Sequence, residues 1–152
     1  MGPVADIILN DVIDNKFEIE LRSFISSIGG AFYDRDIVYK KSSFLLTFGW
    51  SYPDEILEYS HLEKAAALKP TAKLNISANS NDESDHRHLG ELCYAIVSKY
   101  SAVLEFCDNL NDRTSEPYLL QHPEHYSNGY TSQFGPDLLS LWLEYKYFHM
   151  VK

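Results

Sequence analysis

The chain has 152 residues, 45% of them hydrophobic, 14% aromatic and 23% charged, with a formal net charge of -9 and a pI near 5.0. This length fits one domain that can bury most of its apolar surface. The acidic balance argues against non-specific nucleic-acid binding, which draws its affinity from lysine and arginine on phosphates, so a basic partner fits better. The only apolar run near the start, Val4 to Leu9, is too short for a signal peptide or a membrane span. We therefore expect a cytoplasmic protein with no membrane partner.

The first thirty residues predict a strand followed by a helix. Val4 to Leu9 is a short β-like run bounded by Gly2-Pro3 and by turn-forming residues. In the next segment Asp14 can cap a helix and Gly29-Gly30 can end it. The apolar residues that recur there with the helical period are Phe17, Leu21, Phe24, Ile25 and Ile28.

The next fifty residues predict mostly strands. Phe32 to Tyr39 and Ser43 to Trp50 are β-rich runs separated by Lys40-Lys41-Ser42, and a hairpin is their simplest pairing. A short helix is expected over residues 56–68, before Lys69-Pro70. Thr71 to Ser77 alternates apolar and polar residues, which is typical of a half-buried strand.

The clearest pattern follows the polar loop of residues 79–83. A helix should start near Ser84, where Asp82, Glu83 and Asp85 lie at the end of the helix dipole that favours negative charge. Its apolar face is formed by Leu89, Leu92, Cys93, Ile96, Val97 and Tyr100. Ala102 to Cys107 then predicts a short buried strand, and a helix leading into such a strand implies a sheet on which the helix packs.

The last forty residues are less regular. Residues 109–136 hold several prolines and glycines, with short strands indicated at Tyr118 to Leu120 and Tyr126 to Ser132, and a helix is expected from Pro136. With no repeat or linker, residues 1–152 predict one α+β domain that has a largely antiparallel sheet with helices on one face. The order of elements resembles a split βαβ arrangement extended at its C-terminus.

Three short patches carry a resemblance to a known family. They are Asp85-His86-Arg87-His88-Leu89-Gly90-Glu91-Leu92, Gly2-Pro3 and Phe148-His149-Met150-Val151-Lys152. With these patches the chain resembles a family of small, functionally uncharacterised bacterial proteins of the immunity-protein type, encoded beside polymorphic or contact-delivered toxins. The resemblance implies a binding protein that neutralises a cognate toxin by occluding its active site or substrate groove. It implies no particular site residues and no cofactor.

Two groups of residues are candidates for the partner-binding surface. The segment from Glu116 to Phe134 mixes aromatic anchors with small polar residues, as recognition surfaces do, although the same rings could pack that segment onto the sheet. The second group is acidic and could steer a basic toxin domain, although charged runs are more often a solvated face. The candidates are Tyr118, Tyr126, Tyr130, Phe134, Asp34, Asp36, Asp54, Glu55 and Glu58.

Two alternatives remain open. A small hydrolase or metal-binding enzyme could use the histidine-rich segments, either His86 and His88 with Asp85 or His122 and His125 with Glu124. Neither spacing matches a known metal signature, so we expect no metal site and no catalytic set. Cys93 and Cys107 read as buried thiols rather than nucleophiles. The second alternative is a self-associating structural or regulatory module.

Overall fold

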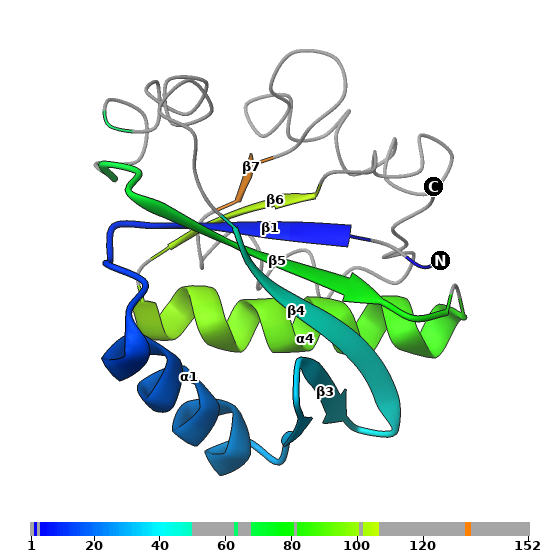
Figure 1. Ribbon diagram of the computed structural model, residues 1–152. Coiled ribbons are helices and arrows are strands. Elements are labelled where there is room, and N and C mark those ends of the chain that lie inside the picture. Colours follow the sequence, from blue (N-terminus) through cyan, green and yellow to red (C-terminus); the bar gives the residue numbers. More distant parts are fainter. Residues whose placement is uncertain are drawn as a thin grey trace, which may run out of the picture.

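The computed structural model describes residues 2, 4–49, 63, 68–80, 82–100, 102–106 and 133–134. Their elements are β1 (Val4–Leu9), α1 (Asn15–Ser27), β2 (Ala31–Tyr33), β3 (Asp36–Tyr39), β4 (Ser42–Gly49), β5 (Ala72–Ala78), α4 (Glu83–Tyr100), β6 (Val103–Phe106) and β7 (Gln133–Phe134). The strands form one seven-stranded sheet in the order β2-β3-β4-β5-β1-β6-β7, and every neighbouring pair is antiparallel (Figure 1). The α+β prediction is confirmed. The helix expected over residues 56–68, the strands expected between residues 118 and 132, and the helix expected from Pro136 lie outside the described residues.

The centre of the sheet is a split βαβ unit. β5 and β6 each pair antiparallel with β1, so they run parallel to each other with β1 between them. Parallel strands need a long crossover, and α4 supplies it by running from the end of β5 to the start of β6. The predicted split arrangement is therefore present, with β1 as its inserted strand.

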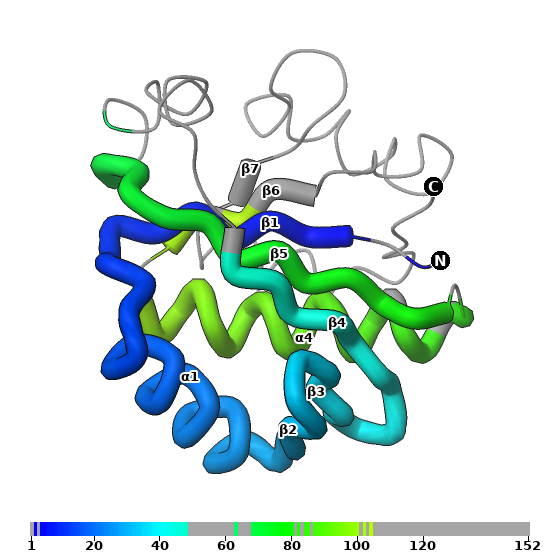
Figure 2. Tube along the Cα trace, in the orientation of Figure 1, coloured from blue at the N-terminus to red at the C-terminus, as the bar shows by residue number. Residues whose placement is uncertain are grey.

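The two helices named above, α1 and α4, lie on the same side of the sheet (Figures 1 and 2), and we call the face that they cover the inner face. The predicted apolar face of α4 is confirmed: Leu92, Cys93, Ile96 and Val97 are fully buried. The sheet side of this core is built by residues that alternate along the strands: Ala5, Ile7, Leu9, Ile37, Phe44, Leu46, Leu74, Ile76 and Leu104. None of the described helices combines the length and the apolar character that crossing a membrane requires.

The ends of α1 follow from local chemistry. Asp14 is the N-cap, and its Oδ1 accepts a hydrogen bond from the backbone N–H of Phe17 at 2.8 Å. At the other end Gly29 has a φ of 96°, a left-handed conformation that glycine adopts without the steric cost of a side chain. Both predicted boundary signals are confirmed. The helix begins at Asn15, two residues before Phe17, which is the first residue of the apolar pattern.

The prediction of one strand from Phe32 to Tyr39 is wrong. The chain reverses at Asp34-Arg35, and β2 and β3 pair as a hairpin of their own. Asp34 has a φ of 59°, which aspartate tolerates better than most residues because its short side chain can bond to the local backbone. The hairpin predicted between this region and the next strand is present as β3–β4, but its turn is Lys40-Lys41 alone and Ser42 already belongs to β4.

Candidate functional site

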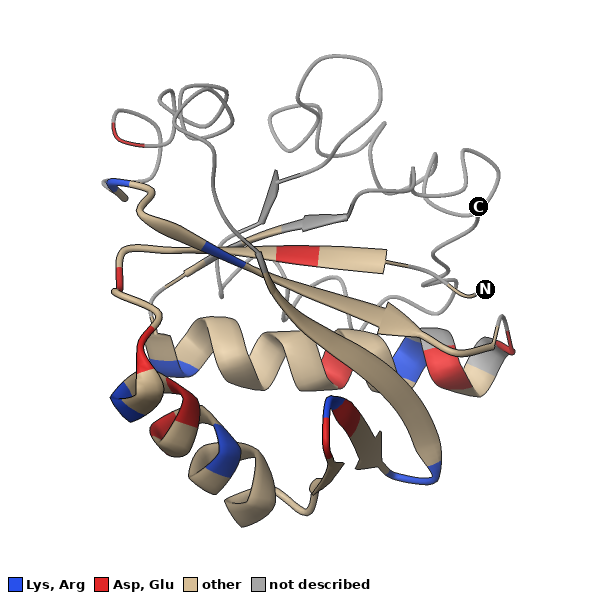
Figure 3. Ribbon diagram, in the orientation of Figure 1, with Lys and Arg blue, Asp and Glu red and all other residues tan. Residues whose placement is uncertain are grey.

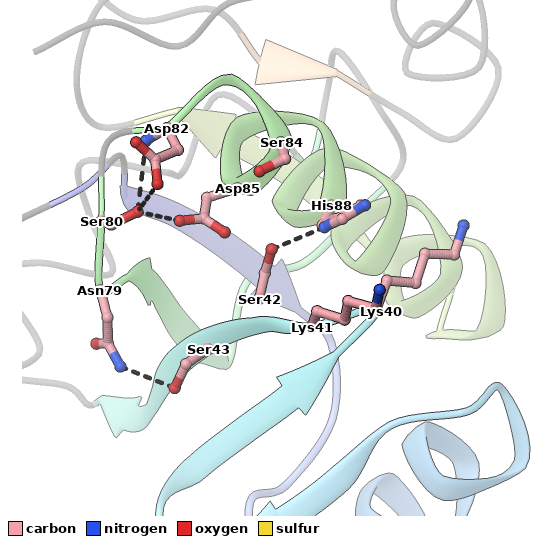
Figure 4. Close-up of a pocket in the computed structure, with 10 residues that line it drawn as sticks. All are labelled: Lys40, Lys41, Ser42, Ser43, Asn79, Ser80, Asp82, Ser84, Asp85 and His88. Carbon is pink, nitrogen blue, oxygen red and sulfur yellow. Dashed lines mark hydrogen bonds between the residues drawn. The ribbon is translucent and has the colours of Figure 1, made fainter.

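A cavity of about 450 Å³ lies where the β3–β4 turn, the end of β5 and the start of α4 meet (Figure 4). All the residues that line it are of polar or charged types: Lys40, Lys41, Ser42, Ser43, Asn79, Ser80, Asp82, Ser84, Asp85 and His88. Strand ends and a helix start meet there because β4, β5 and α4 pack against one another through the inner face. The cavity is therefore held by rigid elements on three sides.

The most buried polar contact in the cavity joins Ser42 to His88. The Ser42 hydroxyl lies 2.7 Å from Nδ1 of His88, and Ser42 is only 3% exposed. A serine hydroxyl beside an imidazole is the first half of a nucleophile and base arrangement. Here, however, Ser42 lines the cavity with very little of its surface open to solvent, which limits the approach of a substrate carbonyl. The contact ties the start of β4 to the second turn of α4.

The acidic side of the cavity is organised by Ser80. Its hydroxyl hydrogen-bonds Asp82 Oδ2 at 3.2 Å and also Asp85 Oδ2 (Figure 4). Because a hydroxyl has one proton, it donates to one of these carboxylates at a time. Among the described residues, no group of three or more His, Cys, Asp or Glu side chains is placed to hold a metal ion. The second histidine segment, His122 to His125, lies outside the described residues.

The basic side of the cavity is the β3–β4 turn. Lys40 and Lys41 have φ values of 50° and 73°, the paired left-handed conformation of a type I′ hairpin turn, where asparagine and glycine are the usual residues. Lys40 Nζ is 2.6 Å from Glu91 Oε2 on α4, and this hydrogen bond raises the pKa of Lys40 above 10.5. Glu91 also lies 3.6 Å from Nε of Arg87. The turn is thereby fastened to α4 at its exposed side.

A second polar group crosses the sheet on the face opposite the helices, which we call the outer face. Thr47, Asn75 and Asp6 are direct neighbours on β4, β5 and β1. Asn75 Nδ2 donates to Asp6 Oδ1 at 2.7 Å, and Thr47 Oγ1 lies 3.4 Å from Asn75 Oδ1. Lys73 Nζ is 3.1 Å from Asp6 Oδ2, and Asp6 is only 5% exposed. We call these four residues the outer-face network.

The outer-face network was missed in the sequence. The alternation in β5 placed Lys73 and Asn75 on the polar face of their strand, which is confirmed. The remaining signal was Asp6, a single carboxylate in an otherwise apolar strand, because a buried charge requires a partner. Nothing in a local pattern says that the partner lies in β5.

The predicted partner-binding residues are only partly described. Asp34 and Asp36 are exposed, on the turn and the second strand of the β2–β3 hairpin. Phe134 is placed in β7, with no description of its side chain. Tyr118, Tyr126, Tyr130, Asp54, Glu55 and Glu58 lie outside the described residues. The structure thus brings together two of the predicted acids and leaves the tyrosine-rich segment as a prediction.

Of the two cysteines, like the partner-binding candidates, only a part is described. Cys93 is fully buried in α4, and this burial raises the pKa of its thiol well above 9.0. A thiol that keeps its proton is a poor nucleophile. Cys107 lies outside the described residues.

Comparison with known proteins gives one family. Residues 1–152 match the model of a family described as "Family of unknown function (DUF6368)", and the chain belongs to this family. No match was found among curated proteins or among solved structures.

Proposed function

We propose that this member of a family of unknown function is an immunity protein, which acts in the cytoplasm by binding a cognate bacterial toxin and occluding its active site or substrate groove. The observation that supports the proposal most directly is the β2–β3 hairpin. It presents the exposed carboxylates of Asp34 and Asp36 next to Tyr33, whose side chain is 66% exposed. An exposed tyrosine beside acidic groups is the composition expected of a surface that recognises a basic protein.

Charge supports a basic partner. The chain carries 22 acidic and 13 basic side chains, and Figure 3 shows acidic residues interspersed with basic ones along α1 and on the hairpin next to it. The carboxylates of Asp34 and Asp36 form no ion pair with any described residue. They are therefore free to attract a cationic surface before contact, which increases the association rate.

Co-expression with the product of the neighbouring toxin gene tests the proposal. Cells that make the toxin should survive only when this protein is present, and the purified pair should associate. The association rate should fall as salt shortens the electrostatic reach to about 8 Å near physiological ionic strength, with a smaller change in the dissociation rate. Equal killing with and without the protein, together with no association of the purified pair, would remove the proposal.

The hydrolase alternative has one observation in its favour, the 2.7 Å contact between Ser42 and His88 at the cavity. A fluorophosphonate probe, which labels activated serines, decides between the two functions. Labelling of the wild-type protein that disappears in Ser42→Ala and in His88→Ala would favour the hydrolase. A binding protein should give no labelling of Ser42 in its folded state.

A further inference from the structure

We propose that the toxin docks on the outer face of strands β2, β3 and β4, and that it presents there a lysine or arginine flanked by apolar side chains. This inference rests on the proposed function and assigns it a surface. Three residues form the docking face: Tyr33, Asp36 and Leu45.

Strand register places these three residues in one row. Tyr33 is the direct neighbour of Asp36 across the β2–β3 pair, and Asp36 is the direct neighbour of Leu45 across the β3–β4 pair. Directly opposed residues in antiparallel strands share a face and have their Cβ atoms about 5 Å apart. The residues before and after them on β3 and β4, such as Ile37 and Phe44, belong to the buried core, so the row points away from the helices.

The row is open to solvent although it is largely apolar. Tyr33 is 66% and Leu45 is 38% exposed, and both are among the exposed large hydrophobic side chains of the described residues. The same face is closed farther along the sheet, where Asp6 and Ile8 of β1 are 5% and 0% exposed. Exposed apolar side chains that are grouped on one half of a sheet face, while the other half of that face is buried, form a candidate contact area.

The negative charge of Asp36 indicates that the docking face binds a cationic group of the partner. Asp36 lies between the two apolar side chains, and its carboxylate has no ion pair with a described residue. Arg22, on α1, is occupied elsewhere: its guanidinium donates to the Asp34 carbonyl oxygen at 3.0 Å and stacks 4.5 Å above the ring of Phe32. A cation from the partner that pairs with Asp36 would be shielded from water by Tyr33 and Leu45, the arrangement that makes an interface contact strong.

The matched alternative is the exposed surface of α1. Ile19 has the same exposed fraction as Tyr33, 66%, and Glu20 is an exposed acid beside it. Substitutions there change the same kinds of groups at similar exposure. They control for general losses of surface hydrophobicity and negative charge.

The experiment measures the affinity of the purified toxin for single variants. Tyr33→Ser and Leu45→Ser should weaken binding, the first by roughly 30-fold or more, and Asp36→Asn should both weaken it and reduce its salt dependence. Ile19→Ser and Glu20→Gln should bind within about threefold of the wild type. Urea melts of each variant show whether a loss of binding comes from a loss of folding. Hydrogen exchange of the wild-type complex locates the contact: the amides of β2 to β4 should gain protection on binding.

Four outcomes would overturn the inference. If the toxin binds the wild type but is indifferent to Tyr33, Asp36 and Leu45, or if α1 gains the protection, the docking face is wrong while the proposed function stands. If no toxin binds the wild type, the proposed function itself has failed. If the wild type is a dimer that Tyr33→Ser dissociates, a second copy of this chain is the occupant.

Discussion

The outer-face network makes a prediction about stability that concerns one carboxylate. Asp6→Ala removes the acceptor for Asn75 Nδ2, at 2.7 Å, and the counter-charge of Lys73 Nζ, at 3.1 Å. The Asp6 side chain is 7% exposed and that of Lys73 is 21% exposed, so both groups of this ion pair are largely removed from water. Removing one partner of a buried ion pair costs about 3–5 kcal/mol. The partial exposure of Lys73 lowers our expectation to about 2–4 kcal/mol.

Urea denaturation measures this cost as a shift of the midpoint at constant slope. Asp6→Asn keeps an oxygen for Asn75 and loses only the charge, so it should cost less than Asp6→Ala. Asp36→Ala is the matched control, because Asp36 is an exposed aspartate on the same face of the sheet and should change stability by no more than about 0.5 kcal/mol. A double-mutant cycle with Lys73→Met should show a coupling of about 0.5–3 kcal/mol. The reasoning is refuted if Asp6→Ala is as stable as Asp36→Ala.

Three further predictions concern α4. Leu92→Ala and Ile96→Ala each open a cavity at a fully buried position and should cost about 2–5 kcal/mol, whereas Ser98→Ala on the exposed side should be close to neutral; full stability of either core variant in urea melts would contradict the placement of this face. In a Cys107→Ser background, Cys93 should react with a disulfide reagent only through unfolding, and fast labelling of the native state would contradict its burial. Because burial raises the pKa of the folded thiol above the 9.0 of the unfolded one, the folded state keeps its proton longer, and stability should decline as pH rises above about 9.

The sequence by itself determined the elements whose signals are local. The 3.6-residue spacing from Leu89 to Tyr100 identified α4 and its buried face, and Asp14 with Gly29 marked both ends of α1. Alternation in β5 identified its buried and polar sides. These predictions succeeded because caps and periodicities depend on residues within a few positions of each other.

Only the tertiary structure decided how the strands align, and the candidate sites depend on that alignment. The Ser42–His88 contact joins residues 46 positions apart, and the Asn75–Asp6 contact joins residues 69 positions apart. The break at Asp34 turned one predicted strand into a hairpin, and that hairpin placed Tyr33 beside Asp36, whose neighbour on the other side is Leu45. Register in a sheet is set by the burial of whole faces against the helices, and a shift of one residue would move every side chain to the other face. A single strand read alone does not contain that information.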